Sequence, residues 1–295
     1  MLLAVVFVFA LGVCVGSFVN VLIFRLPESQ SVVTPGSRCR SCLKPLAWYE
    51  NVPLVSFVAL RGRCRGCGAP ISAQYPLVEL AVGVLFAGNF LLGGPGAAAS
   101  QPEAFQALGD PRWLTGATFT TLLLAIALTD VRTYLIPDEL SLGGLGLGLL
   151  LSLLPGEPSP LDSFLGALAG GGLLLAVAWA GTLLFGKEAM GGGDIKMLAM
   201  IGAFVGWQGV FLTLFVGALL GSVIYGPIAL VQRARGAGAR AAPEERRADA
   251  AASPPSLAAE ASGPESVDRG LVPFGFFLAP AAALTFYLAD ELVRG

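Results

Sequence analysis

The chain is 295 residues long, with 55% hydrophobic and only 13% charged residues, and its formal net charge is −2. This composition is too apolar for one soluble core and is typical of a polytopic membrane protein, with no sign of a nucleic-acid partner. The absence of histidine excludes Ser-His-Asp and Cys-His nucleophiles and a histidine-bound catalytic zinc. Carboxyl groups are therefore the natural acid and base if the protein is a hydrolase.

Eight apolar segments predict an all-α fold with about eight transmembrane helices. The segments span residues 2–24, 75–94, 114–130, 138–154, 163–185, 194–207, 209–231 and 271–290. The first is not expected to be a cleavable signal peptide, because it has no basic start and no clear small-residue cleavage site ends it.

The basic residues gather on one side of these helices. Of the 18 Lys and Arg residues, all but Arg112 and Arg294 fall in connections that share one side by alternation. Basic connections are retained in the cytoplasm. The loop 25–74 is therefore expected to be cytoplasmic, and both termini are expected to lie outside.

These features predict how the chain is organised. The expected parts are a first span at 1–24, a cytoplasmic four-cysteine loop at 25–74, a six-helix bundle at 75–231, a disordered cytoplasmic linker at 232–270, and a last span with the C-terminus at 271–295. The linker is predicted from its composition, which is rich in Ala, Pro, Arg and Glu.

Four of the five cysteines form two Cys-x-x-Cys pairs in the loop, Cys39 with Cys42 and Cys64 with Cys67. Four thiolates at this spacing suit a tetrahedral zinc ion that would stabilise the loop, with no position left for catalysis. Two disulfides are one alternative, which a reducing cytoplasm disfavours, and a redox pair is another. Cys14, alone in an apolar segment, is expected to be a small buried hydrophobe.

Two aspartates stand at edges of apolar segments, Asp130 at the end of one and Asp194, after three glycines, at the start of another. Ionisable groups at such positions indicate function, and two carboxyl groups that share a proton around one water can hydrolyse a peptide bond. From the helix ends they occupy, Asp194 is expected to act as base and Asp130 as acid. The structural alternatives are an N-cap for Asp194, an interfacial position for Asp130 and a first-turn position for Asp138.

Motifs along nearly the whole chain resemble the type IV prepilin peptidases, bifunctional leader peptidases and N-methyltransferases of bacterial membranes. A lone Gly-x-Gly-Asp would be a weak signal, but these motifs in order are specific. They are Gly16-Ser17-Phe18-Val19-Asn20-Val21, both cysteine pairs, Glu50-Asn51-Val52-Pro53-Leu54-Val55-Ser56, Tyr75-Pro76-Leu77-Val78-Glu79-Leu80, Asp130 with Ile136-Pro137-Asp138, residues 186–196 around Gly191-Gly192-Gly193-Asp194, and Pro273-Phe274-Gly275.

The resemblance implies a GxGD-type aspartyl protease of the bacterial inner membrane, with Asp130 and Asp194 as the catalytic pair on the cytoplasmic side. Its substrates would be type IV prepilins and type II secretion pseudopilins, cut after the glycine that ends their basic leader. The resemblance also implies methylation of the new N-terminal amine with S-adenosylmethionine. The family links this second activity to the cytoplasmic loop and to a glycine that Gly62 matches here, and the residues alone carry no methyltransferase signature.

This chain departs from the family pattern at three places: the linker 232–270 is longer than usual, Arg63 stands where some relatives have lysine, and Phe276 replaces a common proline. Asn20 is expected to form a hydrogen bond between helices. Glu79 either supports the methylation site or caps the start of its helix.

Three other functions are compatible with the residues. One is a GxGD peptidase for another signal sequence, such as that of archaeal preflagellin. The others are a transporter with carboxylates in the membrane and an inactive assembly protein that retains the fold.

Overall fold

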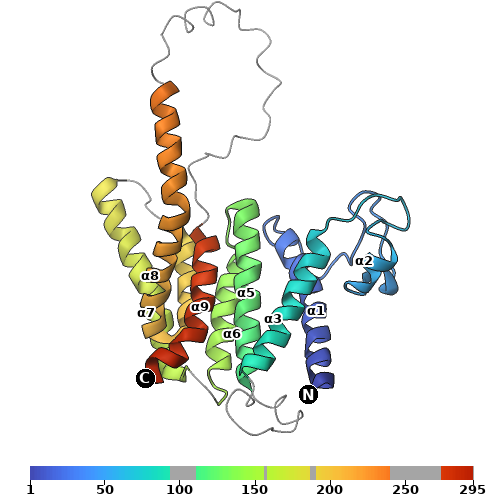
Figure 1. Cartoon of the computed structure of the whole chain (residues 1–295), viewed down its shortest axis with the longest axis horizontal. Helices are drawn as coiled ribbons and strands as arrows, with labels where there is room; N and C mark the ends of the chain where they lie inside the picture. The colour runs from blue at the N-terminus through green and yellow to red at the C-terminus, as the bar shows by residue number, and fades with distance from the viewer. Residues whose placement is uncertain (94–110, 156–157, 187–190, 240–273, 295) are drawn as a thin grey trace, which may run out of the picture.

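The computed structural model describes residues 1–93, 111–155, 158–186, 191–239 and 274–294, which form helices and connecting turns and contain no strand. Figure 1 shows a bundle of helices with a small folded loop beside it. The elements are α1 (Leu2–Arg25), η1 (Trp48–Asn51), α2 (Val55–Ala59), α3 (Gln74–Gly93), α5 (Pro111–Thr133), α6 (Asp138–Leu151), α7 (Pro160–Phe185), α8 (Gly192–Ala239) and α9 (Phe274–Arg294).

Several of these helices are long and apolar enough to cross a membrane. Five meet both criteria over Leu2–Arg25, Gln74–Leu92, Pro111–Thr133, Pro160–Leu184 and Gly192–Ile224, and a shorter apolar helix covers Gly275–Leu288. The predicted all-α polytopic fold is confirmed, and the four cysteines lie between α1 and α3 as expected. We call residues 26–73, between these two helices, the cysteine loop.

α8 consists of two antiparallel halves, because its backbone breaks at Gly206. This glycine has a φ of 72° and a ψ of 174°, which residues with a side chain rarely adopt. Gly209, just after the break, lies beside Thr285 of α9, whereas Gly217 lies beside Leu278, nearer the beginning of α9. The chain therefore reverses at Gly206 and returns along α9.

The two halves correspond to the predicted segments 194–207 and 209–231, so the predicted division of this region into two helical segments is confirmed. The second half continues as a helix to Ala239, eight residues beyond the predicted boundary with the linker. The remaining linker residues, 240–270, lie outside the described part of the chain.

Local sequence signals explain where α7 begins and ends. The Ser159 hydroxyl accepts a hydrogen bond from Asp162 N at 3.2 Å, and Pro160 occupies the first turn, where its missing N–H costs nothing. Gly186 closes the helix with a φ of 66°, the left-handed conformation common after a helix C-terminus.

Close backbone contact between α7 and the first half of α8 depends on glycine. A Cβ atom on Gly166 would collide with the backbone of Gly202, and a Cβ on Gly170 would collide with the carbonyl group of Leu198. Lipid provides no hydrophobic driving force between helices, so small residues that let backbones approach closely stabilise such pairs.

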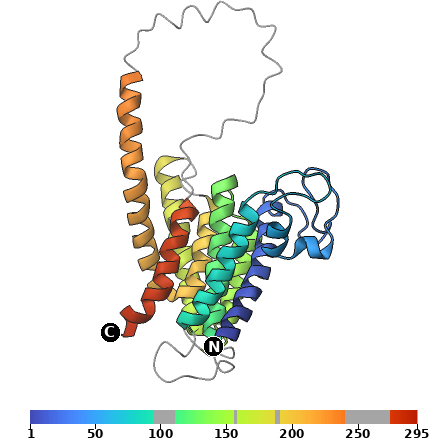
Figure 2. The ribbon, with the colours of Figure 1, turned by 45° about the vertical axis from the view of Figure 1, so that its right-hand side comes forward.

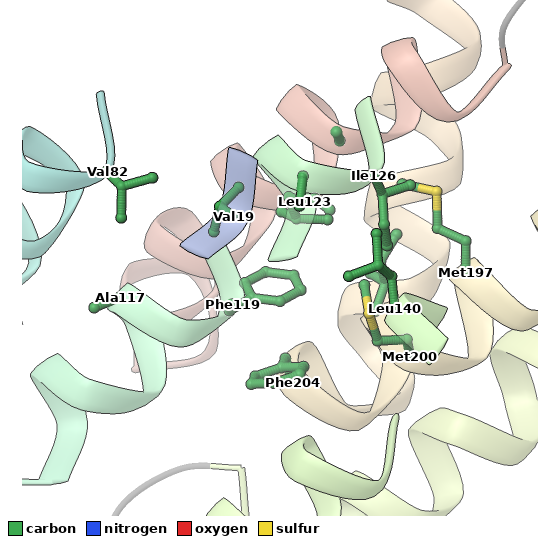
Figure 3. Close-up of a cluster of buried hydrophobic side chains, with 14 of the residues drawn as sticks. Val19, Val82, Ala117, Phe119, Leu123, Ile126, Leu140, Met197, Met200 and Phe204 are labelled. Carbon is green, nitrogen blue, oxygen red and sulfur yellow. The ribbon is translucent and has the colours of Figure 1, made fainter. Parts of the chain in front are cut away.

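The bundle core extends from α1 and α3 across α5 to α6, α8 and α9 (Figure 3). The rings of Phe119 and Phe204 stack with their centroids 4.7 Å apart, and both side chains are fully buried. Leu140, Met197 and Met200 fill the space toward the end of α5 and the starts of α6 and α8. This core fixes the relative positions of the helices that carry the two aspartates.

Polar side chains also tie helices together. Asn89 of α3 accepts a hydrogen bond from the Tyr287 hydroxyl of α9 at 2.8 Å. The Nδ2 atom of Asn20 donates to the carbonyl oxygen of Tyr75 at 3.1 Å, which confirms the predicted hydrogen bond between α1 and α3. Cys14 is exposed on α1, so the prediction that it is buried is wrong. An apolar segment supplies no inward-facing pattern, because in a membrane both faces of such a helix are apolar.

Candidate active site

Asp130 lies in the last turn of α5, where the chain turns toward α6. Its side chain is only 6% exposed, and its Oδ2 atom has no hydrogen-bond partner among the described residues. Tyr134 has a φ of 53°, which helps to stop α5, and Pro137 then precedes the first residue of α6. The sequence thus places a buried carboxyl group, with one oxygen lacking a hydrogen-bond partner among the described residues, at a helix corner.

Asp194 lies in the first turn of α8. The helix begins at Gly192, and the Asp194 amide already donates to the Gly191 carbonyl oxygen at 3.3 Å. Asp194 is therefore inside the helix, so the N-cap interpretation does not describe it. Its side chain stands where the positive end of the helix dipole favours a negative charge.

Ile136 marks the point where the elements around the two aspartates converge. A Cβ on Gly193 would lie 3.1 Å from Ile136 Cβ, and one on Gly275 would lie 3.3 Å from Ile136 Cδ1. The corner after α5, the start of α8 and the start of α9 therefore meet. Asp130 and Asp194 face this meeting point closely enough for the charge of Asp130 to act on Asp194.

Gly275 packs directly against the Asp130 carboxyl group. A Cβ atom at this position would lie only 2.9 Å from Asp130 Oδ2. The first backbone amides of α9, those of Gly275 and Phe276, face the same carboxyl group. Sequence reasoning placed Gly275 in a family motif but gave it no role, because nothing local indicates that α9 begins beside Asp130.

An ion pair joins the starts of α6 and α8 next to the aspartates. Lys196 Nζ lies 2.6 Å from Asp138 Oδ1 and 2.7 Å from Asp138 Oδ2. The two side chains are 38% and 57% exposed, so the pair contributes less than about 1 kcal/mol to stability. It balances the charge of a third carboxylate near Asp130 and Asp194, and it gives Asp138 a more specific role than a first-turn residue.

The four loop cysteines come together in space. Their Sγ atoms all lie within 4.8 Å of one another, and those of Cys39 and Cys67 are 3.8 Å apart. Four thiolates bound tetrahedrally to zinc at about 2.3 Å would have sulfur atoms about 3.8 Å apart. The four sulfur atoms are therefore grouped as the ligands of one metal ion would be.

The two cysteine pairs lie on two copies of one turn. In each copy the fifth residue returns a hydrogen bond to the first cysteine, and a short β-bridge closes the turn. The matching hydrogen bonds are Leu43 N to Cys39 O at 3.0 Å and Gly68 N to Cys64 O at 2.9 Å, and the bridges join Arg38 to Pro45 and Arg63 to Pro70. Amides of such turns point at sulfur: those of Cys42 and Ser41 lower the pKa of the Cys39 thiol from 9.0 to about 6.

Two of the contacts that attach the cysteine loop to the bundle involve Glu79 and Phe24. The Leu54 amide donates a 2.7 Å hydrogen bond to Glu79 Oε2, so Glu79 holds the loop and does not cap its own helix. At the second contact the guanidinium carbons of Arg40 and Arg132 lie 3.8 and 4.0 Å from the centroid of the Phe24 ring. Arg40 belongs to the first cysteine turn, and Arg132 lies two residues after Asp130.

Gly62 forms the turn that follows α2. It has a φ of 67°, its amide donates to the Phe57 carbonyl oxygen at 2.9 Å, and a Cβ would lie 3.1 Å from the Phe57 ring. The left-handed backbone conformation is by itself sufficient to explain why glycine occupies this position. The structure brings Asp130 and Asp194 together in one place and the four cysteines together in another, and Gly62 lies in the fold of the loop.

Two family models match the chain. The Bacterial Peptidase A24 N-terminal domain matches residues 10–92, and the Type IV leader peptidase family matches residues 117–226. The first match covers most of α1, the cysteine loop and nearly all of α3. The second covers Asp130, Asp194 and most of the helices that position them.

Relatives named prepilin leader peptidase/N-methyltransferase align with most of the chain. The one from Klebsiella pneumoniae is 40% identical over 72% of this chain and 90% of its own length. The one from Aeromonas hydrophila is 37% identical over 73% of this chain and 78% of its own length. That from Myxococcus xanthus is 38% identical over 74% of this chain, but the match spans only 61% of that longer protein.

No solved structure matches the chain. The matched regions nevertheless contain both groups of residues that the structure brings together. The chain belongs to the type IV leader peptidase family.

Proposed function

We propose that the protein is a membrane aspartyl endopeptidase that removes the basic leader of type IV prepilins and pseudopilins by cutting after a glycine. The observation that carries this proposal is the meeting of Asp130 and Asp194, from two helices, at one end of the bundle. Family membership supports the choice of substrate, and the relatives' shared name supports both leader removal and N-methylation.

The proposed reaction uses one proton shared by the two carboxyl groups. The ionised carboxylate takes a proton from a water molecule as the water oxygen attacks the carbonyl carbon of the scissile bond. The protonated carboxyl group gives its proton to the carbonyl oxygen, which produces a neutral tetrahedral diol. Transfer of a proton to the leaving nitrogen then breaks the C–N bond and releases the new N-terminal amine together with the leader carboxylic acid.

The assignment of acid and base belongs to the pair and not to either residue. The first turn of α8 favours Asp194 as the base, as the sequence predicts. However, the start of α9 also faces Asp130. Two helix ends therefore act on this carboxyl group: the C-terminal end of α5 and the N-terminal end of α9. We therefore propose Asp194 as the base in the first step while the proton moves between the two groups during turnover.

The setting proposed for this reaction is the bacterial inner membrane, with the aspartates at the cytoplasmic side. The abundance of Lys and Arg in connections on that side supports this orientation. A prepilin would then keep its basic leader in the cytoplasm, next to the aspartates. Its scissile bond must leave the helical conformation before it reacts, because helix geometry protects the backbone carbonyl group.

We propose that the metal held by Cys39, Cys42, Cys64 and Cys67 is zinc and that it only stabilises the fold of the loop. The fit of the sulfur distances to a tetrahedral thiolate site supports zinc. Methylation of the new N-terminus with S-adenosylmethionine is proposed from the relatives' names, with the cysteine loop and Gly62 as its associated region.

Purified protein in lipid nanodiscs, incubated with a purified prepilin, tests the peptidase directly. We expect Asp130→Asn and Asp194→Asn each to lower the cleavage rate by at least about 100-fold, because each removes one half of the acid–base pair. Asp162→Asn is the matched control, because Asp162 lies at the start of α7 and bonds to Ser159. A variant that folds and keeps more than a tenth of the wild-type rate would remove that aspartate from the reaction.

Methylation is tested with the same samples and added S-adenosylmethionine. We expect Gly62→Ala to lower methyl transfer more than cleavage, because it distorts the loop and leaves the aspartates in place. If both rates fall equally, Gly62 serves only the stability of the protein.

A further inference from the structure

The cysteine loop exposes apolar side chains that its own fold does not cover. Trp48 at the start of η1 is 82% exposed, and Val55 and Val58 of α2 are 65% and 74% exposed. Val55, Val58 and the exposed Ala59 occupy one face of this short helix, since residues three and four apart are neighbours on a helix surface. We call residues 48–59 the η1–α2 segment.

The attachment to Glu79 places this segment beside the bundle and not beyond its end. Leu54, just before α2, bonds to Glu79, which lies five residues after the start of α3. At the rise of an α-helix, this is about 7.5 Å below the first residue of α3. Figures 1 and 2 both show α2 alongside the first turns of α3, next to the membrane-crossing helices.

The level of the membrane surface follows from polar groups at the same end of the helices. Arg132 Nη1 donates to Gln74 Oε1 at 3.1 Å, so charged and amide groups gather where α3 begins. The interfacial layer of a bilayer is about 5–7 Å thick on each side. The Glu79 side chain leans back toward the start of α3, so the segment bonded to it lies at most about 7.5 Å from such groups, within the interfacial layer where amphipathic helices lie on membranes.

Charge and aromatic content match the same surroundings. The loop 25–74 contains seven Lys and Arg residues and only two Glu residues, which favours contact with anionic head groups. Arg65 donates to the Tyr49 hydroxyl at 2.9 Å beside Trp48, and aromatic residues with basic neighbours are typical of membrane interfaces. α3 also exposes Leu77, Leu80 and Val84 along the span that follows.

From these observations we infer that the η1–α2 segment inserts into the bilayer interface through Trp48, Val55 and Val58. The cysteine loop is then a membrane-surface domain held at a fixed depth, and not a domain projecting freely into solvent. The inference concerns lipid contact alone and does not depend on the proposed peptidase activity.

Fluorescence quenching of Trp48 in nanodiscs that hold one chain each tests this inference. A variant with Trp113→Phe, Trp179→Phe and Trp207→Phe leaves Trp48 as the sole tryptophan. We expect lipids brominated near the glycerol end of the chains to quench most of its emission, and aqueous acrylamide to quench little. If this variant does not fold, the quenching of Trp48 is obtained by subtracting the emission of the Trp48→Phe variant from that of the wild-type protein, with and without each quencher.

Two further variants make the result specific. Val55→Asp with Val58→Asp should expose Trp48 to acrylamide, whereas Val33→Asp, at a loop residue that is 78% exposed outside the segment, should not. A variant retaining only Trp179, exposed on α7, reports lipid quenching independently of the loop.

Three outcomes would overturn the inference. The first is free access of acrylamide to Trp48 with no quenching by lipid. The second is protection that arises only when a prepilin is added, which would identify a substrate surface. The third is protection only in discs with two chains, which would identify a contact between copies.

Discussion

Gly275 leaves no room for a side chain beside the Asp130 carboxyl group at the candidate active site. The carboxyl group of Asp130 is buried, its Oδ2 atom has no hydrogen-bond partner among the described residues, and the glycine leaves just enough space for it. The position of the carboxyl group therefore depends on Gly275 having a hydrogen atom where alanine would have a methyl group.

We predict that Gly275→Ala lowers the turnover number for prepilin cleavage by about 10- to 100-fold, because the new methyl group must displace Asp130 Oδ2. Gly143→Ala is the control, since a Cβ on Gly143 meets no atom within 4 Å. Turnover numbers are measured in nanodiscs, with circular dichroism to verify folding. An unchanged rate in a folded Gly275→Ala protein would show that Asp130 tolerates displacement or does not react.

The sequence predicted the two aspartates because charged residues at apolar edges are rare and costly. It did not predict the contacts of Gly275 or of Lys196 with Asp138. These depend on which helix starts lie side by side, and no residue pattern within one helix encodes that arrangement.

At the scale of single elements, the cysteine loop is a small unit whose fold depends on four thiols and on its attachments at Glu79 and Phe24. Its helical parts, η1 and α2, have only 4 and 5 residues. Such short helices are not stable alone. A bound metal ion would therefore supply much of the stability of the loop.

We predict about one zinc ion per purified wild-type chain, measured by elemental analysis, and its loss in the Cys39→Ser, Cys64→Ser double variant. Limited proteolysis should then cut this variant within residues 26–73 while the helices stay intact. Cys14→Ser is the control, because Cys14 lies in α1 outside the loop. Wild-type protein that contains no metal and still resists proteolysis would refute a structural metal site.

The pairing of α7 with α8 gives a second test at this scale. We predict that Gly202→Ala lowers the free energy of unfolding by about 1–3 kcal/mol, because its Cβ would collide with the backbone of Gly166. Gly172→Ala, where a Cβ meets no atom within 4 Å, should leave stability unchanged or slightly raised. Chemical denaturation in detergent measures both; equal stability of the two variants would mean that the helices can separate without cost.

Most elements could be predicted from apolar length, and the two cysteine turns from their spacing. The two halves of α8 were predicted as the segments 194–207 and 209–231, but the residue at which the backbone reverses was not, because an apolar run does not mark it. Gly206 is one of several glycines in the region, and only its φ of 72° distinguishes it. Cys14 was assigned to the interior for a similar reason: hydropathy does not separate a lipid-facing side of a helix from a core-facing side.

At the scale of the whole molecule, α1, α3 and the cysteine loop form one part, and α5 to α9 form the part with the aspartates. Arg40, Phe24 and Arg132 connect the two parts, since Arg40 belongs to a cysteine turn and Arg132 to the helix of Asp130. The division follows the two family matches, residues 10–92 and 117–226. The all-α, multi-pass architecture was predictable from the lengths of the apolar segments, whereas the contacts between the parts depend on tertiary packing.

The most direct test of the central claim is intact-mass spectrometry of a prepilin co-expressed with the wild-type protein or with Asp194→Asn. The account predicts a prepilin that has lost its leader and gained one methyl group with the wild-type protein, and an unprocessed prepilin with the variant. A full-length prepilin in the presence of wild-type protein, while a verified prepilin peptidase processes it in a parallel culture, would contradict the account.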